Sequence, residues 1–380
     1  MMGNPGWPCN LSLVEKQPEE VIFDQLHTTA FQYTPLGRTI LGPAQNIEKM
    51  TRAHIQDYIS THYGAHRMVI SAAGAVKHED VVEQVKKHFT KLPSNPITTS
   101  QLVAEEPAIF TGSEIRIIDD DLPLAQFAVA FSGASWTDPD FIALMVMQQM
   151  LGSWNKSSGG GKHMGSELVQ RVAINELAES VMAFNTNYKD TGLFGVYAEA
   201  QPWWTELSRS VAGGRWQVSR EISRELMVRL PSGREKDFSF FPCIEIDAGM
   251  QQDSTEATLT MPDCLSDLAY VIMNGICKLS YRVSEADVIR ASNQLKSSLV
   301  LHIDGSGPTA EDIGTQLIAY GRRIPYAELF ARIDSVDAGT IKRVANRFIF
   351  DRDIAISARG PIQDLPDYNW FRRRTYWLRY

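Results

Sequence analysis

The sequence predicts an α+β fold made of two similar domains, each a mixed sheet packed with helices. Three observations predict this class. An internal repeat combines one helix with one strand, helix-like and strand-like segments alternate along the chain, and 380 residues are enough to bury more than one core. The domain boundaries are therefore predicted from the order of the helix-like and strand-like segments along the chain.

The repeat joins residues 51–74 to residues 337–360, which align without a gap. Each copy has apolar residues three or four positions apart, followed by a β-rich run that ends in glycine, which predicts a helix and then a strand. A shorter match, of residues 36–40 with residues 320–324, lies upstream in the same order. The matched pairs are Ile55 with Ile341, Ile70 with Ile356, Ser71 with Ser357 and Gly74 with Gly360.

Further helices and strands are predicted between the two copies. Residues 78–92 place their valines, a phenylalanine and a leucine on one helical face, and the proline-rich residues 93–107 are typical of a linker. Ser284 opens a helix with a capping-box pattern. The other predicted elements are strands at 114–119, 125–131, 180–188 and 192–200, and helices at 138–151, 166–174 and 284–301.

Residues 201–260 do not follow this pattern. They hold three of the eight tryptophans together with many serines and arginines, and they show no sustained period. We interpret them as a disordered insertion in which residues 218–230 could form a short helix.

Composition excludes several functions. The net charge of −8 argues against a general nucleic-acid-binding protein, which needs a basic face. The four cysteines have no regular spacing, which indicates a reducing compartment. The first 20 residues contain one lysine and no arginine, so they do not read as a presequence or signal peptide.

A glycine-rich loop at Gly159, Gly160, Gly161 and Lys162 invites comparison with a phosphate-binding loop. That motif needs an earlier glycine and a serine or threonine after the lysine, whereas His163 follows Lys162 here. The preceding residues are also helical rather than a strand. We expect a flexible connection between two helices, and the sharper alternative is a flap that touches a peptide.

No catalytic motif accompanies the eight histidines. Zinc peptidases place two histidines and a glutamate on one helical turn, as HExxH or HxxEH, and neither pattern occurs in these 380 residues. His62 and His66 are four positions apart, but Gly64 lies between them. We therefore assign no catalytic and no metal-binding residue.

The last residues, 362–380, are basic and aromatic, with Arg372, Arg373 and Arg374 in a row. Two interpretations remain open. The tail could dock on a partner, or it could be an amphipathic terminus packed on its own protein; the second is the more ordinary outcome.

Several long stretches resemble the β subunits of mitochondrial processing peptidase, within the inverzincin metallopeptidases. The stretches are EEVIFDQLHTTAFQYTPLGRTILGP (19–43), LGSWNKSSGGGKHMGSELVQRVA (151–173), YRVSEADVIRASNQLKSSLVLHIDG (281–305), residues 319–356 and residues 360–380. The resemblance implies two similar α+β domains, in agreement with the repeat. It also implies that the zinc-binding HxxEH helix belongs upstream of residue 19, where this sequence is unlike the family.

The resemblance therefore implies a first domain that is incomplete. We expect an unrelated segment at 1–18, the second half of the first domain at 19–92, a linker at 93–107, a second domain at 108–361 that contains the insertion 201–260, and the tail 362–380. We expect no cofactor in this chain, although the intact family binds zinc.

The resemblance also implies partners and a location. In the family the β subunit works with an α subunit on presequence peptides, at the matrix side of the mitochondrial inner membrane. In plants it is also a core protein of ubiquinol–cytochrome c reductase. We expect a catalytically inactive relative, with a non-catalytic core subunit or a non-functional isoform as the alternatives. Asn187 and Tyr188 could face a substrate by analogy, but a structural role is the simpler expectation.

Overall fold

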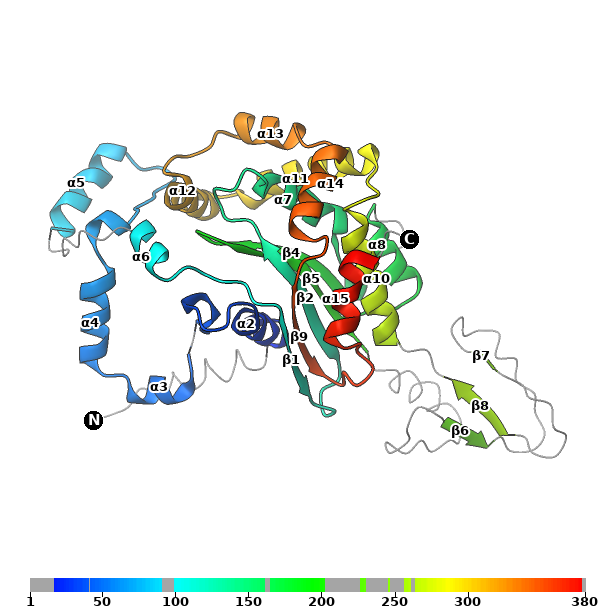
Figure 1. The fold of residues 1–380 in the computed structure, drawn as a ribbon. Helices are drawn as coiled ribbons and strands as arrows, with labels where there is room; N and C mark the ends of the chain where they lie inside the picture. The colour runs from blue at the N-terminus through cyan, green and yellow to red at the C-terminus, as the bar shows by residue number, and fades with distance from the viewer. Residues whose placement is uncertain are drawn as a thin grey trace.

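The computed structural model describes residues 17–40, 42–90, 99–160, 165–201, 226–229, 245–246, 256–260 and 264–377. Its centre is a six-stranded mixed sheet with helices on both faces (Figure 1). The α+β class predicted from the sequence is confirmed. A second, three-stranded sheet lies apart from the first.

The large sheet has the strand order β1-β9-β2-β5-β4-β3. Only the edge pair β1 and β9 is parallel, and every other neighbouring pair is antiparallel. The last strand in the sequence is thus inserted between the first two. The strands are β1 (Ser113–Ile118), β2 (Ala125–Gly133), β3 (Ser153–Asn155), β4 (Ser180–Asn187), β5 (Gly192–Ala200) and β9 (Ile354–Gly360).

Strand β2 shows why the sheet needs two covering layers. Residues 125–131 are all buried, because alternate side chains point to opposite faces and both faces are covered. Phe127, Val129 and Phe131 belong to the larger core, whereas Ala128 and Ala130 belong to a smaller one on the other face. The continuous apolar run in the sequence is the signature of this double burial.

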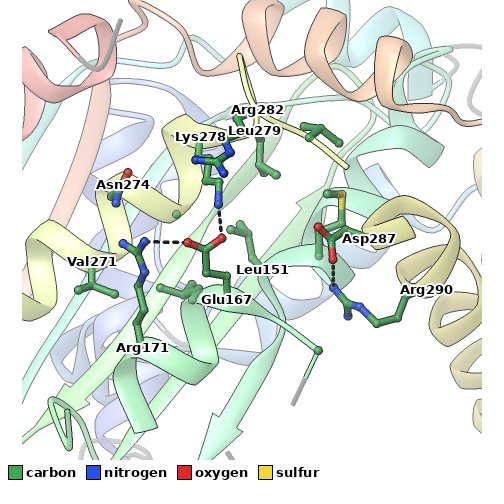
Figure 2. A pocket seen from close by; sticks show the side chains of 15 residues that line it. Leu151, Glu167, Arg171, Val271, Asn274, Lys278, Leu279, Arg282, Asp287 and Arg290 are labelled. Atoms are coloured by element: carbon green, nitrogen blue, oxygen red, sulfur yellow. Dashed lines mark hydrogen bonds and ion pairs between the residues drawn. The ribbon is translucent and has the colours of Figure 1, made fainter. Parts of the chain in front are cut away.

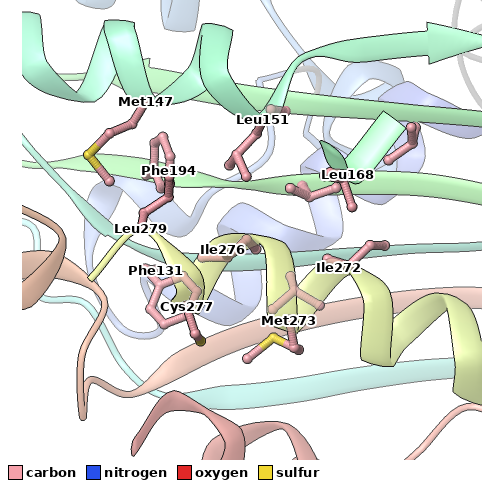
Figure 3. Packing of buried hydrophobic residues seen from close by; sticks show 14 of the residues in the cluster. Phe131, Met147, Leu151, Leu168, Phe194, Ile272, Met273, Ile276, Cys277 and Leu279 are labelled. Carbon is pink, nitrogen blue, oxygen red and sulfur yellow. The ribbon is translucent and has the colours of Figure 1, made fainter. Parts of the chain in front are cut away.

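Most helices pack on the face that carries Phe127 and Phe131. Figure 3 shows Phe131 and Phe194 of the sheet against Met147 of α7 and Ile276 of α10. These side chains, all buried, form one continuous core. The helices that contribute to it are α7 (Phe141–Leu151), α8 (Glu167–Ile174), α10 (Cys264–Lys278), α11 (Glu285–His302), α13 (Tyr326–Asp334), α14 (Ala338–Phe348) and α15 (Tyr368–Trp377).

The opposite face is covered by α2 (Pro18–Ala30), which lies across β9, β2 and β1. Ile22, Leu26 and Ala30 recur every four residues and are fully buried, so one stripe of the helix faces the sheet. Phe31, just after the helix, is also fully buried in this smaller core. The helix α2, near the start of the chain, thus packs against β1 and β2 from its middle and β9 from near its end.

The second copy of the repeat forms α14 and β9, as predicted. The first copy forms its helix, α4 (Arg52–His62), but residues 68–73 form no strand. The strand predicted there is wrong, because a strand needs a hydrogen-bonded neighbour and none pairs with these residues in the described part of the chain. Val69 and Ile70 are consequently exposed.

The elements around α4 lie beside the large sheet rather than on it (Figure 1). On α4, the apolar stripe of Ile55, Tyr58 and Ile59 has exposed fractions of 48%, 59% and 45%. The predicted linker 93–107 is not wholly irregular, since part of it is helical. The elements here are η1 (Pro35–Gly37), α3 (Ala44–Lys49), η2 (Ala65–Arg67), α5 (His78–His88) and α6 (Thr99–Glu105), with α12 (Ser306–Tyr320) nearby.

Three short strands are described within residues 201–260. They are β6 (Leu226–Arg229), β7 (Glu245–Ile246) and β8 (Glu256–Thr260), paired in the order β6-β8-β7. Residues 226–229 are therefore extended and not part of the short helix expected over 218–230; the remainder of that range lies outside the described residues. The domain boundaries stay predictions.

Among the described helices, none has both the length and the apolar composition required to cross a bilayer.

Candidate functional site

The glycine loop follows the end of α7, where Gly152 has a positive φ of 76° that favours glycine. The chain then forms the edge strand β3 and a short turn, η3 (Lys156–Ser158), before Gly159 (φ 68°) and Gly160 (φ 74°). The expectation of a plain helix-to-helix connection is corrected here, because β3 pairs with β4. Gly161 and Lys162 lie outside the described residues.

The described part of this loop is anchored at the edge of the sheet. Trp154 Nε1 donates a hydrogen bond to the carbonyl oxygen of Gly159 at 3.2 Å. Lys156 Nζ makes an ion pair of 2.9 Å with Glu179. Gly159 and Gly160 are exposed and have open space where a Cβ would be, so they leave the loop accessible. Contact of this loop with a peptide stays a prediction.

The three consecutive arginines of the tail have different surroundings on α15. Arg372 pairs with Asp351 at 3.0 Å and with Asp353 at 2.9 Å. Arg374 lies 3.3 Å from the centre of the Trp370 ring, in a cation–π contact. Arg373 is exposed and has no such contact among the described residues. Two of the three are therefore engaged within the chain.

The tail as a whole packs on its own protein. Phe371 is fully buried in the larger core, and Ile362 and Leu365, before the helix, are nearly so. The tail therefore packs on its own protein as an amphipathic terminus, which is the second of the two interpretations given for it above. Docking through the tail stays a prediction that concerns Arg373 above all.

On the sheet face under α2, His27 and Tyr188 form a hydrogen-bonded pair. The Tyr188 hydroxyl lies 2.5 Å from His27 Nε2, and His27 Nδ1 lies 2.7 Å from the carbonyl oxygen of Phe23. The carbonyl can only accept, so Nδ1–H donates to it, and in that tautomer Nε2 accepts the hydrogen bond that the Tyr188 hydroxyl donates. Burial raises the pKa of Tyr188 to about 12, so the phenol stays protonated.

Asn187, the residue before Tyr188, is buried and donates from Nδ2 to the carbonyl oxygen of Ala134 at 2.7 Å. Both residues thus make contacts within the fold, in line with the simpler structural expectation.

A second polar cluster surrounds Glu199 at the end of β5. Tyr197 and Ser180 donate their hydroxyl protons to its carboxylate, at 2.6 Å and 2.9 Å. Partial burial, then repulsion from Glu199 and from Glu20, raise the pKa of the Glu19 carboxyl. Because Tyr197 and Ser180 both donate to the Glu199 carboxylate, this cluster serves to fix the Glu199 side chain within the fold.

Zinc does not fit the described residues. A zinc site needs three or four His, Cys, Asp or Glu side chains converging on one point. In the described ranges, no three such residues are placed so that they could hold a metal ion together, and both ring nitrogens of His27 have partners. No chemistry through zinc is therefore derived for this part of the chain.

Sequence reasoning did not find the His27–Tyr188 pair, since 161 positions separate the two residues and neither belongs to a motif. A basic cavity beside α8 was not predicted either, because its lining residues come from α8 and, about 100 positions later, from α10 and α11. Only Lys278 and Arg282, four positions apart, hint at a basic surface there.

Comparison with known proteins agrees with this fold. The family model for the "Peptidase M16 inactive domain" matches residues 49–209. Over 97% of its length, the chain has a TM-score of 0.76 and 23% identity to a chain of Complex III2 from Candida albicans, of which it covers 73%. At that identity the structural likeness concerns the fold.

Sequence relatives carry the comparison further. The chain is 64% identical, over 97% of its length, to the probable mitochondrial-processing peptidase subunit beta of Arabidopsis thaliana, and covers 58% of that protein. It is 38% identical, over 96% of its length, to the corresponding beta subunit of Bos taurus and covers 62% of it. The chain thus spans less than two thirds of these relatives.

Residues 49–209 are therefore similar to the peptidase M16 family. The chain is homologous to the beta subunits of mitochondrial-processing peptidase, as the sequence resemblance predicted.

Proposed function

We propose that these residues act as a non-catalytic, assembly-forming part of a mitochondrial-processing peptidase beta-type protein in the mitochondrion. The observation that carries the proposal is the 64% identity to the Arabidopsis beta subunit over almost the whole chain. The curated relatives are mitochondrial by name, which supports the location.

Two observations support the non-catalytic part of the proposal. Neither HxxEH nor HExxH occurs in the 380 residues, and no group of three potential ligands in the described ranges is placed to hold a metal ion. The family model that matches residues 49–209 is the one described as inactive. A zinc-dependent peptidase would need its metal ligands from elsewhere.

The exposed apolar stripe on α4 supports a role in assembly. Ile55, Tyr58 and Ile59 share one face of the helix, and each is nearly half exposed or more. An amphipathic helix normally buries such a stripe, so a covering partner would stabilise it. We propose a processing-peptidase alpha-type subunit as that partner. Subunits of ubiquinol–cytochrome c reductase are the second candidate.

The test is co-purification of the tagged chain with an alpha-type subunit, together with elemental analysis for zinc and a presequence-peptide cleavage assay. We expect a stable complex with no stoichiometric zinc and no cleavage. Stoichiometric zinc with cleavage would overturn the non-catalytic assignment, and a chain indifferent to the alpha-type subunit would overturn the assembly role.

A matched pair of variants tests the surface. Ile55→Asp places a charge in the apolar stripe, whereas Gln56→Asp places the same charge at the neighbouring exposed position. The first should reduce recovery of the complex by about tenfold, and the second should leave it nearly unchanged. Equal recovery of both complexes would exclude α4 as the contact. Capture by reductase subunits instead of the alpha-type subunit would favour the second candidate.

A further inference from the structure

We propose that the cavity bounded by α8, α10 and the start of α11 binds a small oxyanion, a phosphate or carboxylate group. Figure 2 shows this cavity, with basic side chains reaching it from several elements. Arg171 comes from α8, Lys278 ends α10, Arg282 lies in the turn after it, and Arg290 belongs to α11. The proposal is independent of peptidase activity and of the assembly role.

The charge of the cavity is opposite to that of the chain. Four basic side chains line it, together with only two acidic ones, Glu167 and Asp287, whereas the net charge of the whole chain is −8. Basic groups gathered on an acidic protein create a local positive potential that attracts anions. The excess of positive side chains in the lining therefore favours an anion over a cation as the ligand.

Glu167 neutralises only part of this charge. Its carboxylate pairs with Arg171 at 2.7 Å and with Lys278, which links α8 to α10 (Figure 2). The hydrogen bond from Lys278, followed by the attraction of Lys278 and Arg171, lowers the pKa of Glu167, so the carboxylate stays charged at neutral pH. The wall of the cavity is fixed by this three-residue cluster.

Two guanidinium groups remain for a ligand. Attraction from Arg282 also helps lower the pKa of Glu167, but Arg282 has no carboxylate at ion-pair distance in the ranges that the structure describes. Arg290 makes one long contact of 3.4 Å with Asp287. Two guanidinium groups on one cavity are the donors that recognise phosphate and carboxylate oxygens, because each presents a planar fork of N–H groups.

A glycine gives Arg290 its position. A Cβ at Gly165 would lie 2.6 Å from Arg290 Cδ and 2.7 Å from its Cζ, which is closer than real contacts allow. The side chain of Arg290 therefore lies directly against the Gly165 backbone, at the border of the cavity. Any larger residue at position 165 would push the guanidinium aside without changing the charge.

The dimensions favour a small group. The cavity holds about 70 Å³, far below the roughly 300 Å³ or more of pockets that enclose whole small molecules. Leu168, Leu279 and Val283 form its apolar wall. Such a wall lowers the local dielectric constant and strengthens the attraction between a guanidinium and an oxyanion. We therefore expect a single phosphate or carboxylate group, not a nucleotide.

The test is isothermal titration calorimetry of the full chain with inorganic phosphate, and separately with acetate, at low ionic strength. We expect saturable binding of phosphate. Binding of phosphate alone assigns a phosphate site, and binding of both assigns a general oxyanion site. Binding of acetate alone assigns a carboxylate site. No saturable heat with either anion up to about 10 mM would overturn the proposal.

Three variants localise the binding. Arg282→Glu should weaken it by about tenfold or more, and Gly165→Ala should weaken it severalfold through Arg290 alone. Arg373→Glu is the matched control, because it reverses the charge of an exposed arginine on α15, away from the cavity lining. If Arg282→Glu does not fold, Gly165→Ala decides. Equal affinity of the parent and Gly165→Ala, or an equal loss in Arg373→Glu, would overturn the assignment to this cavity.

Discussion

Arg343 holds the carboxylate of Asp140 at two points, with hydrogen bonds of 2.7 Å to Oδ1 and 3.2 Å to Oδ2, across 203 positions of sequence. Arg347, one helical turn further on, donates to Asp140 at 2.6 Å. Only 4% of the Asp140 side chain is exposed, and the residue stands immediately before α7. The two arginines thereby attach α14 to the beginning of α7.

Replacing Asp140 with asparagine should lower the free energy of unfolding by about 1 to 3 kcal/mol, because charge-assisted hydrogen bonds to a buried carboxylate are lost. Both arginines are about half exposed, so solvent screens their charges and the expected loss of stability lies near the lower value, about 1 kcal/mol. Chemical denaturation at neutral pH measures it. Asp334→Asn is the control, since its pair with Lys296 is on the surface and its loss should cost less than about 1 kcal/mol.

The same variant has a defined pH dependence. The hydrogen bond from Arg343 is the main cause that lowers the pKa of Asp140 below its ordinary value. A carboxyl with a lowered folded-state pKa stabilises the protein above its unfolded pKa of about 3.9 and loses that contribution as the pH falls further. The difference between the parent and Asp140→Asn should therefore shrink below about pH 4. A constant difference down to pH 2 would contradict this origin.

Tyr188→Phe should lower the free energy of unfolding by about 1 kcal/mol, because His27 Nε2 loses its hydrogen-bond donor beneath α2. Hydrogen exchange of the α2 amides should rise with it, since the pair holds α2 to the sheet. Tyr58→Phe, on an exposed side chain of α4, is the matched control. An equal effect of the two variants would show that the His27–Tyr188 bond contributes nothing.

Cys277 should be unreactive until the fold opens. It is 2% exposed in the larger core, and burial raises the pKa of its thiol to about 12, so almost no thiolate forms at neutral pH. A variant with Cys9, Cys243 and Cys264 replaced by serine isolates this thiol. Labelling with a disulfide reagent should then proceed at the rate of unfolding. Complete labelling within seconds under native conditions would contradict the burial.

Phe371→Ala should destabilise the protein by about 3 to 5 kcal/mol, since a fully buried phenylalanine is removed from the core between α15 and the sheet. Arg373→Ala on the same helix should change the stability by less than about 0.5 kcal/mol, because its side chain is exposed. Thermal and chemical unfolding compare the two variants. A loss below about 1 kcal/mol for Phe371→Ala would mean that the tail is not part of the core.

Local patterns predicted the elements whose own residues show a clear period, even where their sheet partners are distant in sequence. The helix and strand of the second repeat copy, and the strands at 125–131 and 192–200, form where their periodicity placed them. The strand at 68–73 failed because periodicity reports a preference for extended backbone, whereas a strand also requires a neighbour. The two copies have similar sequences and different surroundings.

Long-range arrangements were not predictable in the same way. The stripe of Ile22, Leu26 and Ala30 marks one face of α2 but does not say which sheet it covers. The parallel pairing of β1 with β9 joins residues about 240 positions apart, with no short turn to indicate it. Site residues such as His27 and Tyr188 meet only because α2 lies on that face.

The place of β9 between β1 and β2 has a consequence for synthesis of the chain. While the ribosome is still translating the residues before Ile354, β1 has no neighbour in the described sheet and β2 has only one, β5. The larger sheet therefore closes only after the residues up to Gly360 have emerged. Until then the backbone edge of β2 remains open to pairing with other nascent chains. A holding chaperone would be needed most in the interval between translation of Ala200 and translation of Gly360.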